Sequence, residues 1–146
     1  RGRIREVLDL DIAAPASQVW AYVSAWGATH KWIPGVGPVT VAGDGPGSTR
    51  SADLDPATGF PGRITERLDA FDADAMEFRY RVVGDSPIPI ADYIATMKVE
   101  DLGDGTCSVT WTSTWTPNGD LSADELCAAF EGLYAVSLDN VAAALA

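Results

Sequence analysis

The sequence predicts an α+β fold in which a curved antiparallel sheet closes around a long C-terminal helix. Consecutive segments of alternating apolar and polar residues run through most of the chain, as they do in half-buried strands. After them comes one apolar stripe at helical spacing, from Leu126 to Leu145. Antiparallel strands need a cover for their apolar face, and this helix is the largest apolar element left to provide one. We therefore expect the sheet to curl around the helix.

The N-terminal part of the chain predicts one strand and one helix. Residues 4–12 alternate between apolar and charged side chains, with Val7 as the exception. Pro15 suits the first turn of a helix, and Gly27 offers a C-terminal stop. The apolar stripe between them consists of Val19, Trp20, Val23 and Trp26. The spacing predicts a helix of about three turns.

The middle of the chain predicts six further strands. Gly and Pro are dense across residues 35–62, which hold two short β-rich pieces at 39–41 and 48–54. Longer alternating segments follow at residues 63–70, 76–83, 91–101 and 106–116. Between the last two segments, Asp104-Gly105 is typical of a hairpin. No linker is long enough to divide residues 1–146 into more than one domain.

The start of the C-terminal helix can be placed from its capping residues. Ser122 and Glu125 have the spacing of a capping box, and Leu121 with Leu126 has the spacing of a hydrophobic staple. Gly132 interrupts this helix at a cost of about 1 kcal/mol relative to Ala. We expect that glycine to let the sheet or a ligand approach the helix closely.

Strand phase predicts which side chains face the interior, because alternate residues share one face. The inward residues include many aromatic rings mixed with small and polar side chains. Two interpretations stay open: the rings fill a solid core, or they form the wall of a small-molecule pocket. On the second interpretation, the ligand-binding residues are Trp32, Phe78, Tyr93, Met97, Trp111, Ser113, Trp115, Phe130 and Tyr134.

One strand places a carboxyl group among apolar neighbours. Glu66 shares a face with Ile64 and Leu68, and Arg50 shares a face with Ala52 on the preceding strand. The two charges are expected to pair, because an unpaired buried charge costs several kcal/mol. The pair either braces the wall or orients a polar group of a ligand and supplies a general acid or base.

Composition and charge exclude several classes of protein. The chain has 21 acidic and 10 basic side chains, and its net charge of −11 repels phosphate backbones, so we expect no nucleic-acid partner. Its longest uncharged segment, residues 12–30, is too polar to span a bilayer, and no signal-peptide pattern opens the chain. We therefore predict a cytoplasmic protein. Cys107 and Cys127 are expected to be free thiols, with a disulfide between them as the alternative.

Common catalytic motifs are missing. His30 is the only histidine and no GxSxG motif occurs, which excludes Ser-His-Asp hydrolysis. The glycine-rich segment 43–47 leads into no predicted helix, and the aspartates at 53 and 55 lack the glycine and glutamate of a calcium loop. We expect neither a metal nor a cofactor.

Short motifs along nearly the whole chain occur in the order of a known family. They lie at residues 14–20, 32–34, 47–50, 66–68, 80, 93 and 111–117. Together they resemble the START-like (SRPBCC) superfamily, in particular its polyketide cyclase/dehydratase branch. The resemblance implies one helix-grip domain over residues 1–146, with a seven-stranded sheet around the C-terminal helix and a deep cavity between them. It implies function less sharply, since such domains include cyclases, lipid carriers, hormone receptors, condensing enzymes and chaperone regulators.

Two functions follow as hypotheses from the resemblance. The first is an enzyme that promotes cyclisation or dehydration of a polyketide-like intermediate, in which Arg50 steadies a developing enolate and Glu66 or Tyr80 shuttles a proton. The second is a non-catalytic carrier or sensor of a lipid or another hydrophobic metabolite. Either function needs a hydrophobic small molecule as partner, and the sequence is compatible with a monomer or a homodimer.

Overall fold

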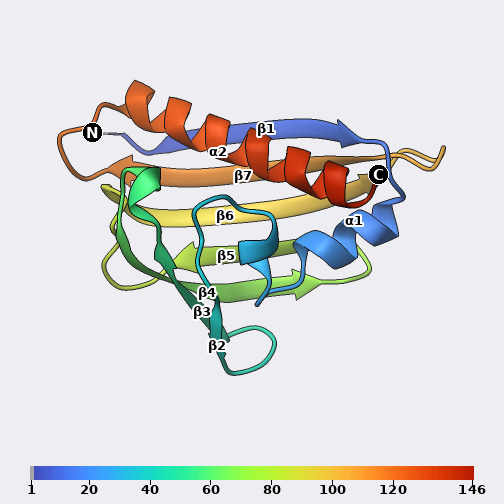
Figure 1. Cartoon of the computed structure of the whole chain (residues 1–146), viewed down its shortest axis with the longest axis horizontal. Coiled ribbons are helices and arrows are strands. Elements are labelled where there is room, and N and C mark those ends of the chain that lie inside the picture. Colours follow the sequence, from blue (N-terminus) through green and yellow to red (C-terminus); the bar gives the residue numbers. More distant parts are fainter. Residues whose placement is uncertain (1) are drawn as a thin grey trace.

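A computed structural model describes residues 2–146 of the chain, which form seven strands, two α-helices and two short 3₁₀ helices. Figure 1 shows their arrangement. In chain order the elements are β1 (Ile4–Ile12), α1 (Ala16–Val23), η1 (Thr29–Lys31), β2 (Thr40–Ala42), β3 (Thr49–Leu54), η2 (Pro56–Thr58), β4 (Gly62–Asp72), β5 (Glu77–Val82), β6 (Ile90–Asp101), β7 (Cys107–Pro117) and α2 (Ala123–Ala144).

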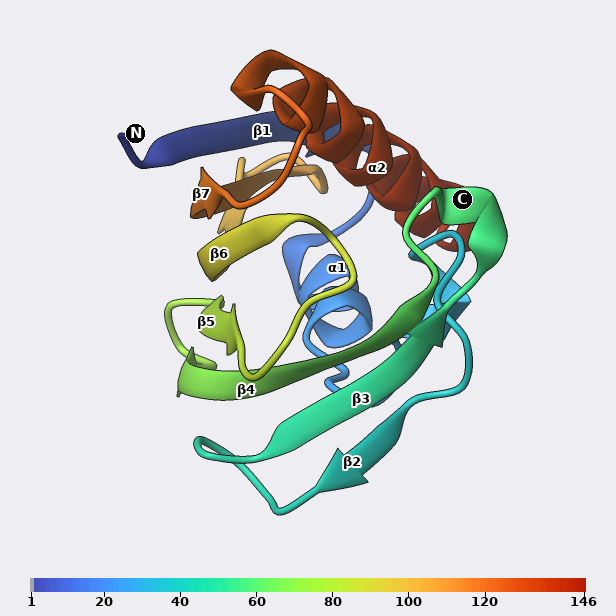
Figure 2. The same cartoon turned by 90° about the vertical axis from the view of Figure 1, so that its left-hand side faces the viewer.

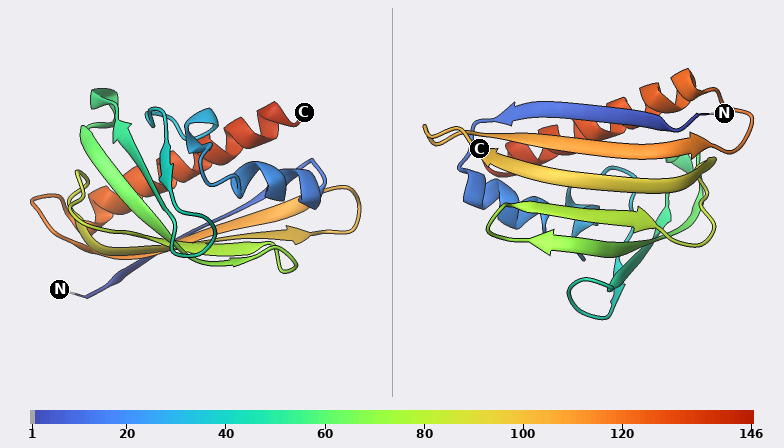
Figure 3. Two further views of the ribbon diagram at one scale, coloured as in Figure 1. Left: turned by 90° about the horizontal axis from the view of Figure 1, so that it is seen from below. Right: turned by 180° about the vertical axis from the view of Figure 1, so that it is seen from behind.

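All seven strands belong to one antiparallel sheet, with the order β1-β7-β6-β5-β4-β3-β2. Both helices lie on its concave side, and the sheet bends from β1 round to β3 and β2 (Figure 2). Among residues 2–146, no helix lies on the opposite, outer face (Figure 3, right). The predicted α+β fold, with a curved sheet around the C-terminal helix, is therefore confirmed. None of the described helices is long and apolar enough to cross a membrane.

Two irregularities in strand pairing contribute to the bend. The register shifts between Leu68 and Ala70 in β4 and between Ala91 and Ile94 in β6, and such bulges increase the local twist of a strand.

Asp69 lies at the first register shift, and two arginines bind its carboxylate. Arg67 Nε donates to it at 2.9 Å and Arg81 Nε at 2.5 Å. Burial works against ionisation there, but hydrogen bonds from the two arginines hold the pKa of Asp69 below 3.8.

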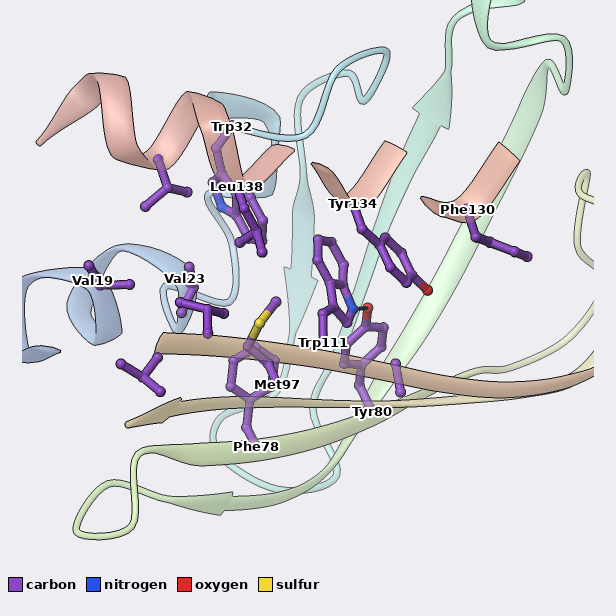
Figure 4. Close-up of a cluster of buried hydrophobic side chains, with 14 of the residues drawn as sticks. Val19, Val23, Trp32, Phe78, Tyr80, Met97, Trp111, Phe130, Tyr134 and Leu138 are labelled. Atoms are coloured by element: carbon purple, nitrogen blue, oxygen red, sulfur yellow. Dashed lines mark hydrogen bonds between the residues drawn. The ribbon is translucent and has the colours of Figure 1, made fainter. Parts of the chain in front are cut away.

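The predicted strand phase agrees with the observed burial. Along β7, Trp111, Ser113 and Trp115 are buried, while the threonines between them are half-buried on the outer face. The same alternation in β6 buries Tyr93 and Met97. Aromatic side chains thus concentrate on the concave face (Figure 4).

The first helix is shorter than predicted. It ends at Val23, where Ser24 caps it, and not at Gly27. Trp26 therefore lies beyond the helix, and its ring packs on the guanidinium group of Arg50. The apolar spacing continued past Val23 because Trp26 is part of the interior, although not part of the helix.

The C-terminal helix begins as predicted. Ser122 Oγ accepts a hydrogen bond from the Glu125 amide, and Glu125 Oε1 accepts one from the Ser122 amide, each at 3.1 Å. The expectation for Gly132 is wrong: the residue is exposed, and a Cβ atom there meets nothing within 4 Å. Cys107 and Cys127 are free thiols, of which Cys107 is buried.

Replacing Gly132 by alanine should raise the free energy of unfolding by roughly 0.5–1 kcal/mol, because alanine loses less conformational entropy in a helix and fits here without a clash. Urea denaturation of the parent and of Gly132→Ala measures the difference.

Gly35→Ala is the matched contrast. Gly35 has a φ of 79°, and a Cβ atom there would lie 2.3 Å from Cγ2 of Thr58. This substitution should lower stability by about 1 kcal/mol or more. A Gly132→Ala protein no more stable than its parent would contradict the placement of Gly132 on an open helix surface.

Candidate ligand-binding cavity

A cavity of about 500 Å³ lies between the sheet, α2 and the loops beside them. Its wall comes from the inner faces of β3 to β7, from one side of α2 and from the connections that precede β2, β4 and β6. The volume falls within the range of small-molecule sites, roughly 300–1,000 Å³, and most of the lining side chains are apolar. The concave face is therefore not packed solid throughout.

Some of the predicted site residues line this cavity and others do not. The three predicted catalytic residues, Arg50, Glu66 and Tyr80, all contribute to the wall. The predicted ligand-binding residues that line it are Tyr93, Trp111, Phe130 and Tyr134. Those that lie in the packed core, outside the lining, are Trp32, Phe78, Met97, Ser113 and Trp115.

The position of α1 explains part of this division. Val19 and Val23 of α1 are fully buried and lie on the same side of the interior as Phe78 and Met97 (Figure 4). That end of the concave face is therefore filled. At the other end, Trp115 is covered by Phe130 of α2, with ring centroids 5.2 Å apart, and has no exposed surface.

Arg50 and Glu66 form an ion pair in the wall. They are direct cross-strand partners on β3 and β4, and Arg50 Nε donates to Glu66 Oε1 at 2.7 Å. Their side chains are 6% and 17% exposed, so the pair is largely shielded from solvent. The predicted pairing is confirmed. Because the carboxylate compensates the guanidinium charge, neither group stands in the interior as an isolated charge.

Two aromatic rings fix the guanidinium group from its sides. The Arg50 Cζ atom lies 3.8 Å from the ring centroid of Trp26 and 4.8 Å from that of Tyr80. Arg50 Nη1 also donates to the backbone oxygen of Trp26 at 3.3 Å. Such cation–π contacts are favourable when the cation is shielded from water. The contribution of Trp26 was missed from the sequence, where its spacing suggested only a helix stripe.

A group of hydroxyls lies further along the wall. Tyr80 Oη accepts a hydrogen bond from Trp111 Nε1 at 3.2 Å, drawn as a dashed line in Figure 4. The hydroxyls of Tyr93 and Tyr134 are hydrogen-bonded to each other. Burial raises the pKa of all three tyrosines above 10.0, and the neighbouring charge of Glu66 adds to the effect at Tyr80. These hydroxyls therefore stay protonated at neutral pH.

The bulge in β6 lies next to one of these tyrosines. Asp92 immediately precedes Tyr93 and has a φ of 55°, the left-handed conformation that Asp tolerates better than most residues. Arg3 Nη2 donates to the Asp92 carbonyl at 2.5 Å and to Thr114 Oγ1 at 2.8 Å, from the outer side of the sheet. Bulges re-aim side chains, and here Tyr93 is buried against the cavity.

Loops supply lining residues that sequence reasoning missed. Ile33, Val36, Phe60 and Ile88 all line the cavity from segments outside the regular strands. The loops before β2 and β4 are joined to each other: the amide of Asp55 donates to the carbonyl of Gly35 at 2.8 Å. The available signal was the presence of large apolar side chains within Gly- and Pro-rich segments, where solvated loops carry few of them.

The sequence and the fold have counterparts among known proteins. A family model described as "Polyketide cyclase / dehydrase and lipid transport" matches residues 5–146. Among curated proteins, none matches the chain.

Solved structures are similar over nearly the whole chain. An uncharacterised protein from Bacillus thuringiensis has a TM-score of 0.84 at 22% identity, with 97% of this chain and 98% of that chain covered. A protein from Thermobifida fusca has a TM-score of 0.79 at 30% identity, covering 94% and 90%. The Zhui aromatase/cyclase from a Streptomyces species has a TM-score of 0.81 at 18% identity, covering 99% and 94%. At 22% and 18% identity, the first and the last show the fold alone.

The buried tyrosines predict a loss of stability in alkali. Above pH 10 the unfolded chain releases tyrosine protons that the folded chain retains, so the free energy of unfolding falls as pH rises. Each such tyrosine contributes a slope of about 1.4 kcal/mol per pH unit until its folded form also ionises. Tyr93→Phe should make the decline shallower by about one such contribution. Urea titrations at a series of pH values across this range measure both slopes.

Tyrosinate absorbance provides the internal control for this experiment. The native protein should form tyrosinate at higher pH than the same protein in denaturant. Equal slopes for the parent and Tyr93→Phe would show that Tyr93 does not retain its proton in the folded state.

Proposed function

Because the chain belongs to the polyketide cyclase/dehydrase and lipid transport family, we propose that it binds a polyketide-like intermediate in the cavity and promotes its cyclisation or dehydration. The observation that carries this proposal is the convergence of three kinds of group on one apolar cavity. Glu66 is a carboxylate, Arg50 a fixed cation and Tyr80 a protonated hydroxyl. These are the groups that enolate chemistry requires.

The first step is removal of a proton from a carbon atom between two carbonyl groups. Glu66 accepts this proton and becomes neutral, and the electron pair left on the substrate forms an enolate. The neutral Glu66 no longer compensates the charge of Arg50, which becomes available to the enolate oxygen. The ion pair thus keeps the total charge of the cavity constant while the negative charge moves from protein to substrate.

The second step closes the ring. The enolate carbon attacks a carbonyl carbon of the same molecule, and the new alkoxide oxygen takes a proton from Tyr80 or from Glu66. Its raised pKa keeps Tyr80 protonated between turnovers, so when Tyr80 is the donor, the proton held by Glu66 returns to Tyr80 and leaves Glu66 ionised again. A proton donated by Glu66 restores the original ion pair. Dehydration then removes this hydroxyl as water, together with one proton from the neighbouring carbon.

Positioning supplies the remainder of the catalysis. A polyketide-like chain carries both its nucleophile and its electrophile, and holding them together can contribute roughly 7–11 kcal/mol in the best oriented systems. The aromatic rings of Trp111, Phe130 and Tyr134 form a rigid wall for this purpose, since Trp111 and Tyr134 stack with centroids 4.0 Å apart.

A non-catalytic carrier of a hydrophobic metabolite is the second candidate. Two observations favour it: the family description includes lipid transport, and Arg50 and Glu66 already compensate each other's charge without a ligand. A carrier needs only an apolar cavity to hold its ligand. In a carrier, the ion pair would serve to brace β3 against β4.

Glu66→Gln separates the two functions. For an enzyme, this change should lower turnover of a poly-β-ketone thioester analogue at least about 100-fold, because glutamine cannot accept the proton. Binding of the analogue should change less than about tenfold, since the shape of the side chain is retained. Product formation by chromatography and binding by tryptophan fluorescence give the two readouts.

Glu77→Gln is the control, because Glu77 lies on β5 outside the cavity lining and the substitution is chemically the same. It should leave both readouts unchanged. If the parent binds the analogue but converts it no faster than buffer does, the carrier function replaces the enzymatic one.

A further inference from the structure

The charges around the cavity restrict the kind of molecule that fits it. Taking the proposed function as its basis, we infer that the cavity selects uncharged guests bearing a hydroxyl or enol group and excludes free carboxylates and phosphates. This selection distinguishes two chemical classes of hydrophobic metabolite that the apolar volume alone would accept equally.

Few charged side chains reach the cavity. Within residues 2–146 those that line it are Arg50, Glu66 and Asp55, which together carry one positive and two negative charges. Asp55 stands at the start of η2, where its carboxylate accepts a hydrogen bond from the amide of Ala57 at 2.8 Å. The lining therefore has no surplus positive charge to compensate an anionic guest.

The single cation of the lining is already engaged. Arg50 Nε is bound to Glu66, Nη1 is bound to the Trp26 carbonyl, and the Trp26 and Tyr80 rings lie close to the guanidinium group. A carboxylate placed at the remaining N–H groups would stand beside Glu66. Two like charges that close, in an interior shielded from water, repel strongly.

A hydroxyl group matches the ion pair in a way that a carboxylate does not. Only Oε1 of Glu66 binds Arg50, and within the described residues Oε2 accepts no side-chain hydrogen bond. Arg50 likewise has N–H groups beyond those used by Glu66 and Trp26. An O–H group donates and accepts at once, so it can serve both partners. An ionised carboxylate only accepts and leaves Glu66 Oε2 facing another oxygen.

The surface charge acts in the same direction. A net charge of −11 lowers the concentration of anions near the protein surface and raises that of cations. The concentration of neutral molecules is unaffected. This effect is screened by salt, whereas repulsion inside the cavity is screened much less. Salt dependence therefore separates the two contributions.

Three naphthalene derivatives of nearly equal size test the selection: naphthol, naphthoate and naphthylmethylammonium. The parent protein at neutral pH and physiological salt should bind naphthol at least about tenfold more tightly than naphthoate. Naphthylmethylammonium should also bind more tightly than naphthoate. Displacement of an environment-sensitive dye measures all three affinities, and these comparisons need no variant.

Glu66→Gln then tests the origin of the selection. Removing this charge leaves Arg50 unpaired, so naphthoate should bind at least about tenfold more tightly than to the parent, while naphthol should lose less than tenfold. Glu77→Gln, with the same change of net charge outside the cavity, should preserve the preference of the parent. Thermal unfolding confirms that each variant is folded. If Glu66→Gln does not fold, the order of the three affinities for the parent at low and high salt decides whether the selection arises in the cavity or from surface charge.

Different results would overturn the selection of uncharged guests and the proposed function. Equal binding of naphthol and naphthoate by the parent overturns the selection but leaves the cavity as a binding site. If Glu66→Gln and Glu77→Gln have equal effects, or if the preference for naphthol disappears at high salt, the preference comes from surface charge. Either result also overturns selection by the cavity. Absence of binding by all three probes overturns the proposed function itself.

Discussion

A straight helix cannot follow a curved sheet, and the space left between the two is the feature on which the rest of this structure depends. With 22 residues, α2 is about 33 Å long and covers the concave face along one line only. The sheet bends away from that line, helped by register shifts in β4 and β6. At one end α1 fills the gap with Val19 and Val23. At the other end α2 packs on Trp115, and the gap remains beside the helix, where loops cover part of it.

The ion pair of Arg50 and Glu66 lies in the wall of this gap. A buried pair of charges contributes little to stability, since removing both ions from water offsets their attraction. Here Arg50 and Glu66 are cross-strand partners, and the rings of Trp26 and Tyr80 lie close to the cation. An apolar pair would brace β3 and β4 equally well. The charged pair adds something that an apolar pair cannot, namely a proton acceptor and a cation at the edge of an apolar volume.

The tyrosines complement this pair because their environment is different. Tyr80, Tyr93 and Tyr134 are buried deeply enough that their hydroxyls keep their protons, whereas Glu66 retains contact with solvent and with a cation. Protonated hydroxyls and a paired carboxylate thus share one cavity. The fold itself is shared by proteins at 18% and 22% identity, so the proposed chemistry depends on these particular side chains and not on the architecture.

The sequence by itself determined the features that depend on neighbouring residues. Strand phase identified the buried face of β7 and placed Arg50 opposite Glu66, and the capping box located the start of α2. Only the tertiary structure decided which part of the buried face is empty. The sequence predicted Trp115 as a pocket residue and did not indicate Phe60, yet Trp115 is packed against Phe130 and Phe60 lines the cavity. The reason is physical: phase is fixed by local geometry, whereas a void depends on the distance between elements far apart in the chain.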